Sequence, residues 1–221
     1  LRSGDKLAHS WCAGEARHPA TLDDHAALAR AGLLLAEATG ETAPRDAAIQ
    51  LVAALDREFW NEAGGGYFFS AADDLVVRPL GAVDHATPAG NGLMVEVLAR
   101  LAAVTGENVY RRRAEALIEA FGGEVARAGL GMATLLAGAE LLDRALSIVI
   151  VGAPDDPVRR ALVAAAFAAD LPDRVVMQVA PDASLPQDHP AAGKGLVKGG
   201  AAAYLCQGQT CSQPITDPLS L

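Results

Sequence analysis

The chain has 221 residues, a formal net charge of −9 at pH 7 and a hydrophobic share of 51%. This length accommodates one large domain, or a domain with a small appendage, and the apolar share is sufficient for a core. The negative charge argues against a nucleic-acid partner, because phosphate binding needs clustered Lys and Arg. The short basic run at 111–113 is expected on the solvated face of a helix.

No membrane span is expected, since the longest uncharged stretch, 128–139, is shorter than the roughly 20 apolar residues that cross a bilayer. Three cysteines are too few for a disulfide scaffold, so we expect a cytoplasmic protein. The chain shows no signal peptide and begins at Leu1 rather than Met, and we expect an amino-terminal part to be absent from it.

The first predicted elements are an entry segment and a pair of helices. Residues 1–20 are expected to be irregular. Thr21-Leu22-Asp23-Asp24 is typical of a capping box and predicts a helix, whose apolar stripe ends at Gly40. A second helix is predicted over residues 44–60, with a proline at its first position.

A glycine-rich turn at 64–66 predicts the entry to a short strand or hairpin. A long connection is expected over residues 70–87. The dipeptide Thr87-Pro88 then predicts the N-cap and the first residue of a third helix, because proline favours the first helical position.

The helical part contains an internal repeat with an offset of 66 residues. Residues 35–55 match residues 101–121, and each copy has an apolar helix that stops at a Thr-Gly step before a second helix begins. This pattern is typical of stacked helical hairpins. It predicts a fourth helix over 108–121. A fifth helix, over 132–143, is apolar nearly all round and is therefore expected to be buried.

From Ala145 the pattern changes to that of a small parallel α/β layer. The predicted strands and helix cover residues 147–152, 156–169, 175–179 and 202–206. A loop rich in Pro, Asp and Gly is expected over 181–195. No phosphate-binding glycine pattern occurs, so no cofactor is predicted. The chain is thus divided into helical hairpins over 1–144 and an α/β extension over 145–221.

Five motifs occur together along the chain. They are Leu22-Asp23-Asp24-His25-Ala26; Phe59-Trp60 with Gly65-Gly66-Tyr67-Phe68; Asp84-His85-Ala86-Thr87-Pro88-Ala89-Gly90-Asn91; Thr105-Gly106 with Tyr110; and Ala203-Tyr204-Leu205-Cys206 with Thr210-Cys211 and Pro214-Ile215-Thr216-Asp217. With them, essentially the whole chain resembles the carboxy-terminal half of the thioredoxin-domain and spermatogenesis-associated proteins. It departs from that family at His25, which replaces a Tyr, and at Ala89, which replaces a Ser.

That family carries an amino-terminal thioredoxin-like domain followed by an (α/α)6 toroid. The toroid is similar to that of N-acylglucosamine 2-epimerases and six-hairpin glycosidases. The resemblance therefore implies a mainly α chain of roughly three hairpins, half of an (α/α)6 barrel, with a small carboxy-terminal α/β extension. Half a ring exposes apolar helix faces, so the implied partner is the missing amino-terminal half or a second copy of the chain.

The resemblance also implies a site in the central cavity of the toroid, for a sugar-like ligand. Acid/base catalysis is assigned to Asp24, Asp84 and His85. Substrate binding is assigned to Trp11, Asp23, His25, Trp60, Tyr67 and Asn91. The structural alternatives stay open, because Asp24 can cap its helix, Asp23 can favour the helix dipole, and Asp84 and Asn91 can hold the long loop.

The cysteines Cys206 and Cys211 are separated by four residues. They are expected to have a structural role, as small buried residues or as a disulfide, or to form a redox pair, since the family also carries a thioredoxin-like domain. A zinc site needs two more ligands, and Cys12 alone does not provide them, so no metal is predicted.

Three functions are consistent with these residues. The first is an enzyme, epimerase-like or hydrolase-like, that acts on a carbohydrate or related small polar substrate by acid/base chemistry. The second is a non-catalytic binding or scaffold module. The third is a thiol-redox accessory linked to a thioredoxin-like domain. Fold analogy alone does not decide among them.

Overall fold

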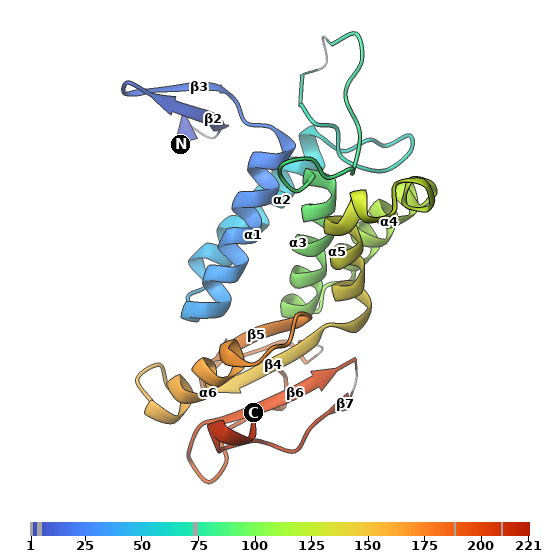
Figure 1. Cartoon of the computed structure of the whole chain (residues 1–221). Coiled ribbons are helices and arrows are strands. Elements are labelled where there is room, and N and C mark those ends of the chain that lie inside the picture. Colours follow the sequence, from blue (N-terminus) through green and yellow to red (C-terminus); the bar gives the residue numbers. More distant parts are fainter. Residues whose placement is uncertain (1, 4–5, 73–74, 188, 209) are drawn as a thin grey trace.

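The chain folds into a layer of helices above a small α/β layer, as a computed structural model shows (Figure 1). The structure describes residues 2–3, 6–72, 75–187, 189–208 and 210–221. Residues 1 and 4–5 of the predicted entry segment, residues 73–74 of the predicted connection and residue 188 of the predicted loop lie outside the described residues. Helices dominate the described part, so the prediction of a mainly α chain is confirmed.

A small antiparallel sheet occupies the amino terminus, where an irregular segment was predicted. Its strands are β1 (Arg2–Ser3), β2 (Lys6–Cys12) and β3 (Glu15–Pro19), in that order. Ala13 and Gly14, both at positive φ, form the turn between β2 and β3. The prediction was wrong because β3 leaves nearly all its side chains exposed, so the sequence carries no apolar alternation there.

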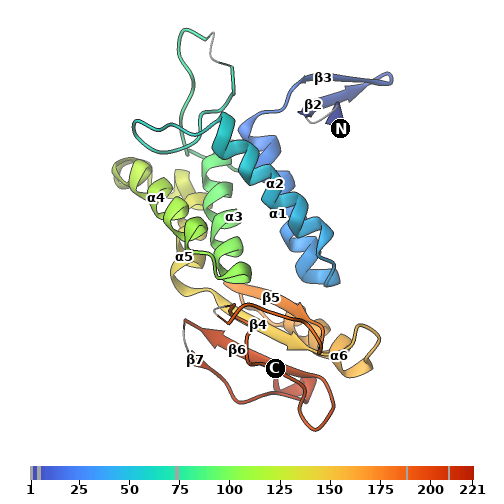
Figure 2. The same cartoon turned by 180° about the vertical axis from the view of Figure 1, so that it is seen from behind.

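Two helical hairpins follow. Their helices are α1 (Leu22–Thr39), α2 (Ala43–Glu58), α3 (Gly90–Thr105) and α4 (Asn108–Ala128). α1 and α3 pack side by side, and α2 and α4 cover them from behind (Figure 2). α1 ends at Gly40, as predicted, because the left-handed conformation that closes the helix favours glycine.

α3 begins later than predicted. Thr87 is not the N-cap, and the helix starts at Gly90 after Ala89. The Ala89 N–H donates to Asp84 Oδ1 at 2.9 Å, and the Gly90 N–H donates to Asp23 Oδ1 at 2.9 Å. Carboxylates from outside the helix therefore satisfy the amides at its start, and a local capping motif cannot reveal them.

The fifth helix, α5 (Ala133–Arg144), follows a 3-10 turn (Gly129–Met132) and packs along α3. Glycines allow this close approach, since a Cβ at Gly92 or Gly138 would lie within 3 Å of a backbone nitrogen of the facing helix. Only one face of α5 is buried, and Leu136 is 38% exposed. The expectation of burial all round was therefore wrong.

One helical stretch of the described residues, 108–144, is long and apolar enough to cross a membrane by length and composition alone. It comprises α4, the 3-10 turn and α5, and both helices pack against α3. Core helices of water-soluble proteins meet the same criterion. The expected absence of a membrane partner therefore stays a prediction.

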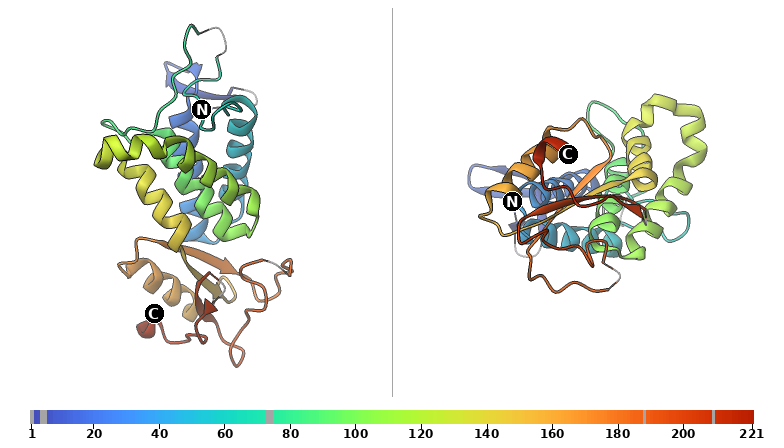
Figure 3. Two further views of the ribbon diagram at one scale, coloured as in Figure 1. Left: turned by 90° about the vertical axis from the view of Figure 1, so that its right-hand side faces the viewer. Right: turned by 90° about the horizontal axis from the view of Figure 1, so that it is seen from below.

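The α/β layer lies at the carboxy-terminal ends of α1 and α3 (Figure 3). Its elements are β4 (Leu146–Val151), α6 (Pro157–Ala168), β5 (Arg174–Val179), β6 (Ala202–Gln207), β7 (Thr210–Cys211) and a 3-10 turn (Pro218–Ser220). The strand order is β5-β4-β6-β7, with β4 parallel to β5 and antiparallel to β6. The sheet is thus mixed, whereas a parallel layer was predicted.

The β4 strand connects two hydrophobic clusters. Val149 and Val151 belong to the core of the helical layer, and Ile148 and Ile150 belong to a cluster with α6. Successive side chains of a strand point to opposite faces, so both faces of the sheet are covered. The core of the helical layer therefore continues into the α/β layer.

Candidate functional site

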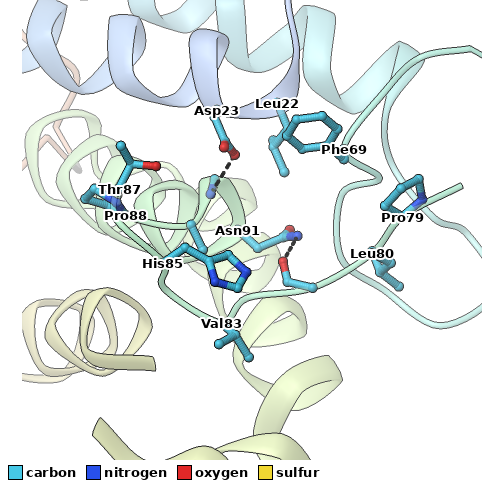
Figure 4. Close-up of a pocket in the computed structure, with 13 residues that line it drawn as sticks. Leu22, Asp23, Phe69, Pro79, Leu80, Val83, His85, Thr87, Pro88 and Asn91 are labelled. Carbon is cyan, nitrogen blue, oxygen red and sulfur yellow. Dashed lines mark hydrogen bonds between the residues drawn. The ribbon is translucent and has the colours of Figure 1, made fainter. Parts of the chain in front are cut away.

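A pocket of about 350 Å³ lies where α1 and α3 begin, beside the connection between α2 and α3 (Figure 4). Apolar walls come from Leu22, Phe69, Pro79, Leu80 and Val83, and polar groups come from Asp23, His85, Thr87 and Asn91. A mostly apolar wall with a few polar groups is typical of small-molecule sites. Three of the predicted site residues, Asp23, His85 and Asn91, thus come together here.

Asp23 is the carboxyl group of this pocket. Its Oδ1 accepts the Gly90 N–H at 2.9 Å. Burial raises the pKa of Asp23, the Gly90 hydrogen bond lowers it in part, and the nearby Asp24 carboxylate raises it further. Gly90 is required here because a Cβ would collide with Asp23 and Leu22. A carboxyl held in one place with a raised pKa can exchange protons with a ligand.

His85 borders the same pocket from the connection before α3. Its side chain is exposed, and its ring points toward the pocket between Asp23 and Val83 (Figure 4). The backbone N–H of His85 donates to the Thr87 carbonyl at 3.2 Å, which fixes the chain at this point. An imidazole ring can act as a general acid or a general base, so His85 is a candidate proton-exchanging group.

Asn91 borders the pocket but its amide is engaged in holding the surrounding backbone. Its Oδ1 accepts the Tyr67 N–H at 2.8 Å, and its Nδ2 donates to the carbonyls of Tyr67 and Gly81, both at 2.9 Å. The residue is 1% exposed. This is the arrangement expected if Asn91 holds the long loop.

Asp24 lies outside the pocket and caps α1. Its Oδ2 accepts the Thr21 N–H at 2.7 Å and the Thr21 hydroxyl at 2.9 Å, and it lies 2.8 Å from His9 Nδ1. Although burial opposes ionisation, these hydrogen bonds lower the pKa of Asp24. The predicted capping box is therefore present. The contact between Asp24 and His9 also connects β2 to α1.

Asp84 also lies outside the pocket lining and joins the starts of two helices. Its Oδ1 accepts the Ala89 N–H and its Oδ2 accepts the Thr134 N–H, both at 2.9 Å. Burial opposes ionisation, but these two amides lower the pKa of Asp84. The carboxylate therefore fixes the start of α3 against the start of α5, which is a structural role other than the predicted one of holding the long loop.

Trp60 and Tyr67 form a separate cluster between α2 and α4. Their rings meet edge to face with centroids 5.0 Å apart, and the Arg113 guanidinium lies 3.8 Å from the Trp60 ring centre. The Tyr67 hydroxyl donates to Asp56 at 2.6 Å. Burial, and then the Asp56 carboxylate, raise the pKa of Tyr67. Neither aromatic ring lines the described pocket.

Trp11 and His25 also lie away from the pocket. Trp11 is on β2 and is 58% exposed. His25 is buried against the Phe59 ring, and its Nδ1 lies 2.7 Å from the Thr21 carbonyl oxygen. His25, which was predicted to bind substrate, therefore does not line the pocket that His85 borders.

Cys206 and Cys211 are joined by a disulfide across β6 and β7. Cys206 is buried and Cys211 is exposed, while Cys12 on β2 has a free, exposed thiol. Across the described ranges, no group of three or more His, Cys, Asp or Glu side chains is placed to hold a metal ion.

A buried ionic cluster where α1 meets β5 was missed by the sequence analysis. Glu37 Oε1 lies 2.7 Å from Arg100 Nη1, and Glu37 Oε2 accepts the Val176 N–H at 3.1 Å. Arg100 also contacts Glu96 at 2.9 Å, which in turn contacts Arg30 at 2.7 Å. Burial raises the pKa of Glu37, although Arg100 lowers it in part.

A signal for this cluster exists in the sequence. Glu37 follows Ala26, Ala29 and Leu33 at helical spacing, and Arg100 lies among the apolar residues of α3. A charged residue inside an apolar stripe indicates a buried partner, because an unpaired buried charge is very unfavourable.

The chain matches no family model. It is 30% identical over 207 residues to spermatogenesis-associated protein 20 of Rattus norvegicus and 31% identical over 207 residues to the protein of that name in Homo sapiens. Each match covers 90% of this chain and 26% of the relative. The chain therefore spans about a quarter of the length of the curated relatives it matches.

Proposed function

We propose a function from the premise that this chain is homologous to the carboxy-terminal portion of spermatogenesis-associated protein 20, which supports its place in that family. The proposed function is acid/base chemistry on a carbohydrate or a related small polar substrate, epimerase-like or hydrolase-like. Its site is the pocket at the start of α1 and α3, where Asp23 and His85 are the proton-exchanging groups.

The position of Asp23 carries this proposal. One carboxyl oxygen is fixed by the Gly90 N–H, burial raises the pKa of the group, and the pocket also contains His85. Two titratable groups in different surroundings are the usual basis of acid/base catalysis. The ring of Phe69 and the face of Pro79 supply an apolar wall for the body of a sugar ring.

The proposed roles of Asp24 and Asp84 differ from those that the resemblance implied. Both carboxylates accept backbone N–H groups at helix starts, and hydrogen bonds lower the pKa of each. In the proposal they position the ends of α1 and α3, and thereby Asp23 and His85, without exchanging protons with the substrate.

We also propose that the helices are half of an (α/α)6 toroid, with α1, α3 and α5 as inner helices and α2 and α4 as outer helices. The layered packing of α1, α3 and α5 supports this arrangement. On α1, Leu28 and Leu35 are 47% and 51% exposed and lie two turns apart. Their exposure supports a covering partner, which is either an amino-terminal half of the toroid or a second copy of the chain. The cytoplasm stays the proposed compartment.

Two alternatives have support of their own. A non-catalytic binding or scaffold module is supported by Asp24 and Asp84, since each is engaged by backbone groups. A thiol-redox accessory is supported by the disulfide between Cys206 and the exposed Cys211.

The proposal is tested by proton exchange and by hydrolysis. The chain is incubated with N-acetylglucosamine in D2O and loss of the C2 proton is followed by NMR, and 4-nitrophenyl glycosides report hydrolysis. We expect turnover that falls at least about 100-fold in Asp23→Asn, because removing a general acid or base has an effect of this size. Asp155→Asn, at an exposed position, is the matched control.

The possible results distinguish the proposed acid/base chemistry from the binding module and the redox accessory. Equal turnover in wild type, Asp23→Asn and His85→Ala would overturn the assignment of this pocket. Saturable sugar binding without product would favour the binding module. A change in the oxidation state of Cys206 and Cys211 during a thiol-exchange assay, measured by intact mass after alkylation, would favour the redox accessory.

A further inference from the structure

A second pocket, of about 380 Å³, lies between the turn that joins α1 to α2 and the carboxyl end of β5. The loop after β5, Val104 of α3, Pro154 and Arg159 of α6 also line it. Its apolar side chains include Leu33, Val104, Met177 and Leu185. Ligands commonly bind outside the carboxyl ends of parallel strands and between layers, and β4 and β5 are such a parallel pair.

The pocket contains a buried cation, Arg159, which is 6% exposed. Its Nη1 donates to the Gly152 carbonyl at 2.9 Å and its Nη2 donates to Gln178 Oε1 at 3.0 Å. Both acceptors are neutral, and they engage two of the five N–H groups of a guanidinium. In the described part of the chain, no carboxylate oxygen lies within 4.0 Å of Arg159.

The guanidinium is held from two sides. The Gln178 amide that accepts from Arg159 donates to the Glu37 carbonyl at 2.8 Å and to the Ala38 carbonyl at 3.1 Å, so its orientation is fixed. Gly40 faces the guanidinium closely, since a Cβ there would lie 2.9 Å from Arg159 Nη2. The position of the cation is therefore determined before any ligand binds.

Among the residues that the structure describes, the charged side chains Glu37, Glu41 and Arg45 of the lining leave Arg159 without a paired anion. The Glu37 carboxylate turns away to Arg100, and Arg45 at the rim pairs with Asp46 at 3.1 Å. Glu41 is exposed to solvent. Burial lowers the pKa of Arg159, and Asp156 at the start of α6 offsets this only in part. A buried charge is stabilised by an anion that reaches it.

We infer that this second pocket binds a small organic monocarboxylate, whose carboxylate is held by Arg159 and whose apolar body lies against Leu33, Val104 and Met177. Guanidinium groups bind carboxylates through paired, charge-assisted hydrogen bonds. The guanidinium of Arg159 supplies one positive charge, which matches the single negative charge of a monocarboxylate. The inference is independent of the sugar chemistry proposed for the first pocket.

The test compares octanoate with 1-octanol by isothermal titration calorimetry, because the two ligands differ only in the charged head group. We expect the chain to bind octanoate at least about tenfold more tightly than octanol, and Arg159→Gln to remove that difference. Arg160→Gln makes the same change of charge at the next, exposed residue of α6 and is expected to leave octanoate binding unchanged.

A second variant tests the inference in case Arg159→Gln does not fold. Ala36 lines the pocket from α1, so Ala36→Phe is expected to abolish octanoate binding while Arg159 stays in place. Equal affinity for octanoate and octanol, absence of octanoate binding to the wild type, or unchanged binding in Arg159→Gln would overturn the inference. Competition by inorganic phosphate would overturn the assignment to a carboxylate.

Discussion

The two helical hairpins end their first helices in the same way. The Thr39 hydroxyl donates to the Leu35 carbonyl at 2.8 Å, and the Thr105 hydroxyl donates to the Leu101 carbonyl at 2.7 Å. The glycine that follows each threonine has φ 76°. These contacts are local, so a repeated sequence produces a repeated geometry.

The same helices begin in different ways. Thr21 and Asp24 form the capping box of α1. Thr87 follows Thr21 by 66 residues, the offset of the repeat, but it is not the N-cap of α3. α3 instead uses Asp23 from the neighbouring helix and Asp84 from the preceding connection. A repeat in sequence therefore predicts structure only where the contacts that decide it lie within the repeat.

The largest expected effect concerns the ionic cluster that holds the first hairpin on the sheet. We expect Glu37→Ala to destabilise the chain by about 3 kcal/mol, because Arg100 would lose its buried partner and the Val176 N–H would lose its acceptor. The free energy of unfolding, from urea denaturation followed by circular dichroism, measures the change.

A matched control for this substitution is Glu41→Gln, at an exposed position just after α1. It is expected to change the free energy of unfolding by less than about 0.5 kcal/mol. Equal effects of the two substitutions would mean that the cluster does not stabilise the junction between the hairpin and the sheet.

The sequence predicts those features of the fold that depend on contacts between nearby residues. The capping box at Thr21, the stop at Gly40 and the strands around Ile148 and Val176 depend on nearby residues, and the sequence predicts them. The helical spacing of Glu37 indicates that its side chain is buried, but it does not identify the β5 amide of Val176 as a partner, because the two residues lie far apart in the chain.

Some of the predicted site residues share a pocket, and others do not. Asp23, His85 and Asn91 were predicted from motifs and meet in one pocket. Trp60 and Tyr67 belong to another of the five motifs and pack between α2 and α4, where the hydroxyl of Tyr67 donates to Asp56. A motif shows which residues occur together, and packing decides which of them share a cavity.

The second prediction concerns a substitution at the first residue of α3. We expect Gly90→Ala to destabilise the chain by about 2 kcal/mol, because the new methyl group would collide with Asp23 and Leu22 at a close contact between helices. Gly122→Ala, on an open face of α4, is expected to stabilise the chain by about 0.5 kcal/mol. A loss of stability in both variants would contradict the role of the close contact.

The third prediction concerns how the carboxyl groups of Asp23 and Asp24 affect the pH dependence of stability. The pKa of Asp24 is lowered in the folded chain. The carboxylate therefore stabilises the fold at pH values above the unfolded pKa, and this stabilisation is lost as pH falls through the folded pKa. We expect Asp24→Asn to cost about 1.5 kcal/mol at pH 7 and progressively less on acidification below about pH 4.

Asp23→Asn is the comparison for this pH dependence. Since the pKa of Asp23 is raised in the folded chain, the protonated carboxyl stabilises the fold at low pH. This stabilisation is lost as pH rises through the folded pKa. The asparagine keeps an oxygen acceptor for Gly90, so its stability relative to wild type should improve with rising pH. Parallel pH profiles for the two variants would show that the two carboxyls do not differ in this way.

The smallest expected effects test the two equivalent threonines directly. Thr21→Ala removes the hydroxyl that donates to Asp24 in the capping box, and should cost about 1 kcal/mol. Thr87→Ala should change the free energy of unfolding by less than about 0.5 kcal/mol, because Asp23 and Asp84 satisfy the start of α3. Urea denaturation at pH 7 measures both. If Thr87→Ala costs as much as Thr21→Ala, then the second hairpin begins as the first one does, and capping by carboxylates from neighbouring elements does not determine where α3 starts.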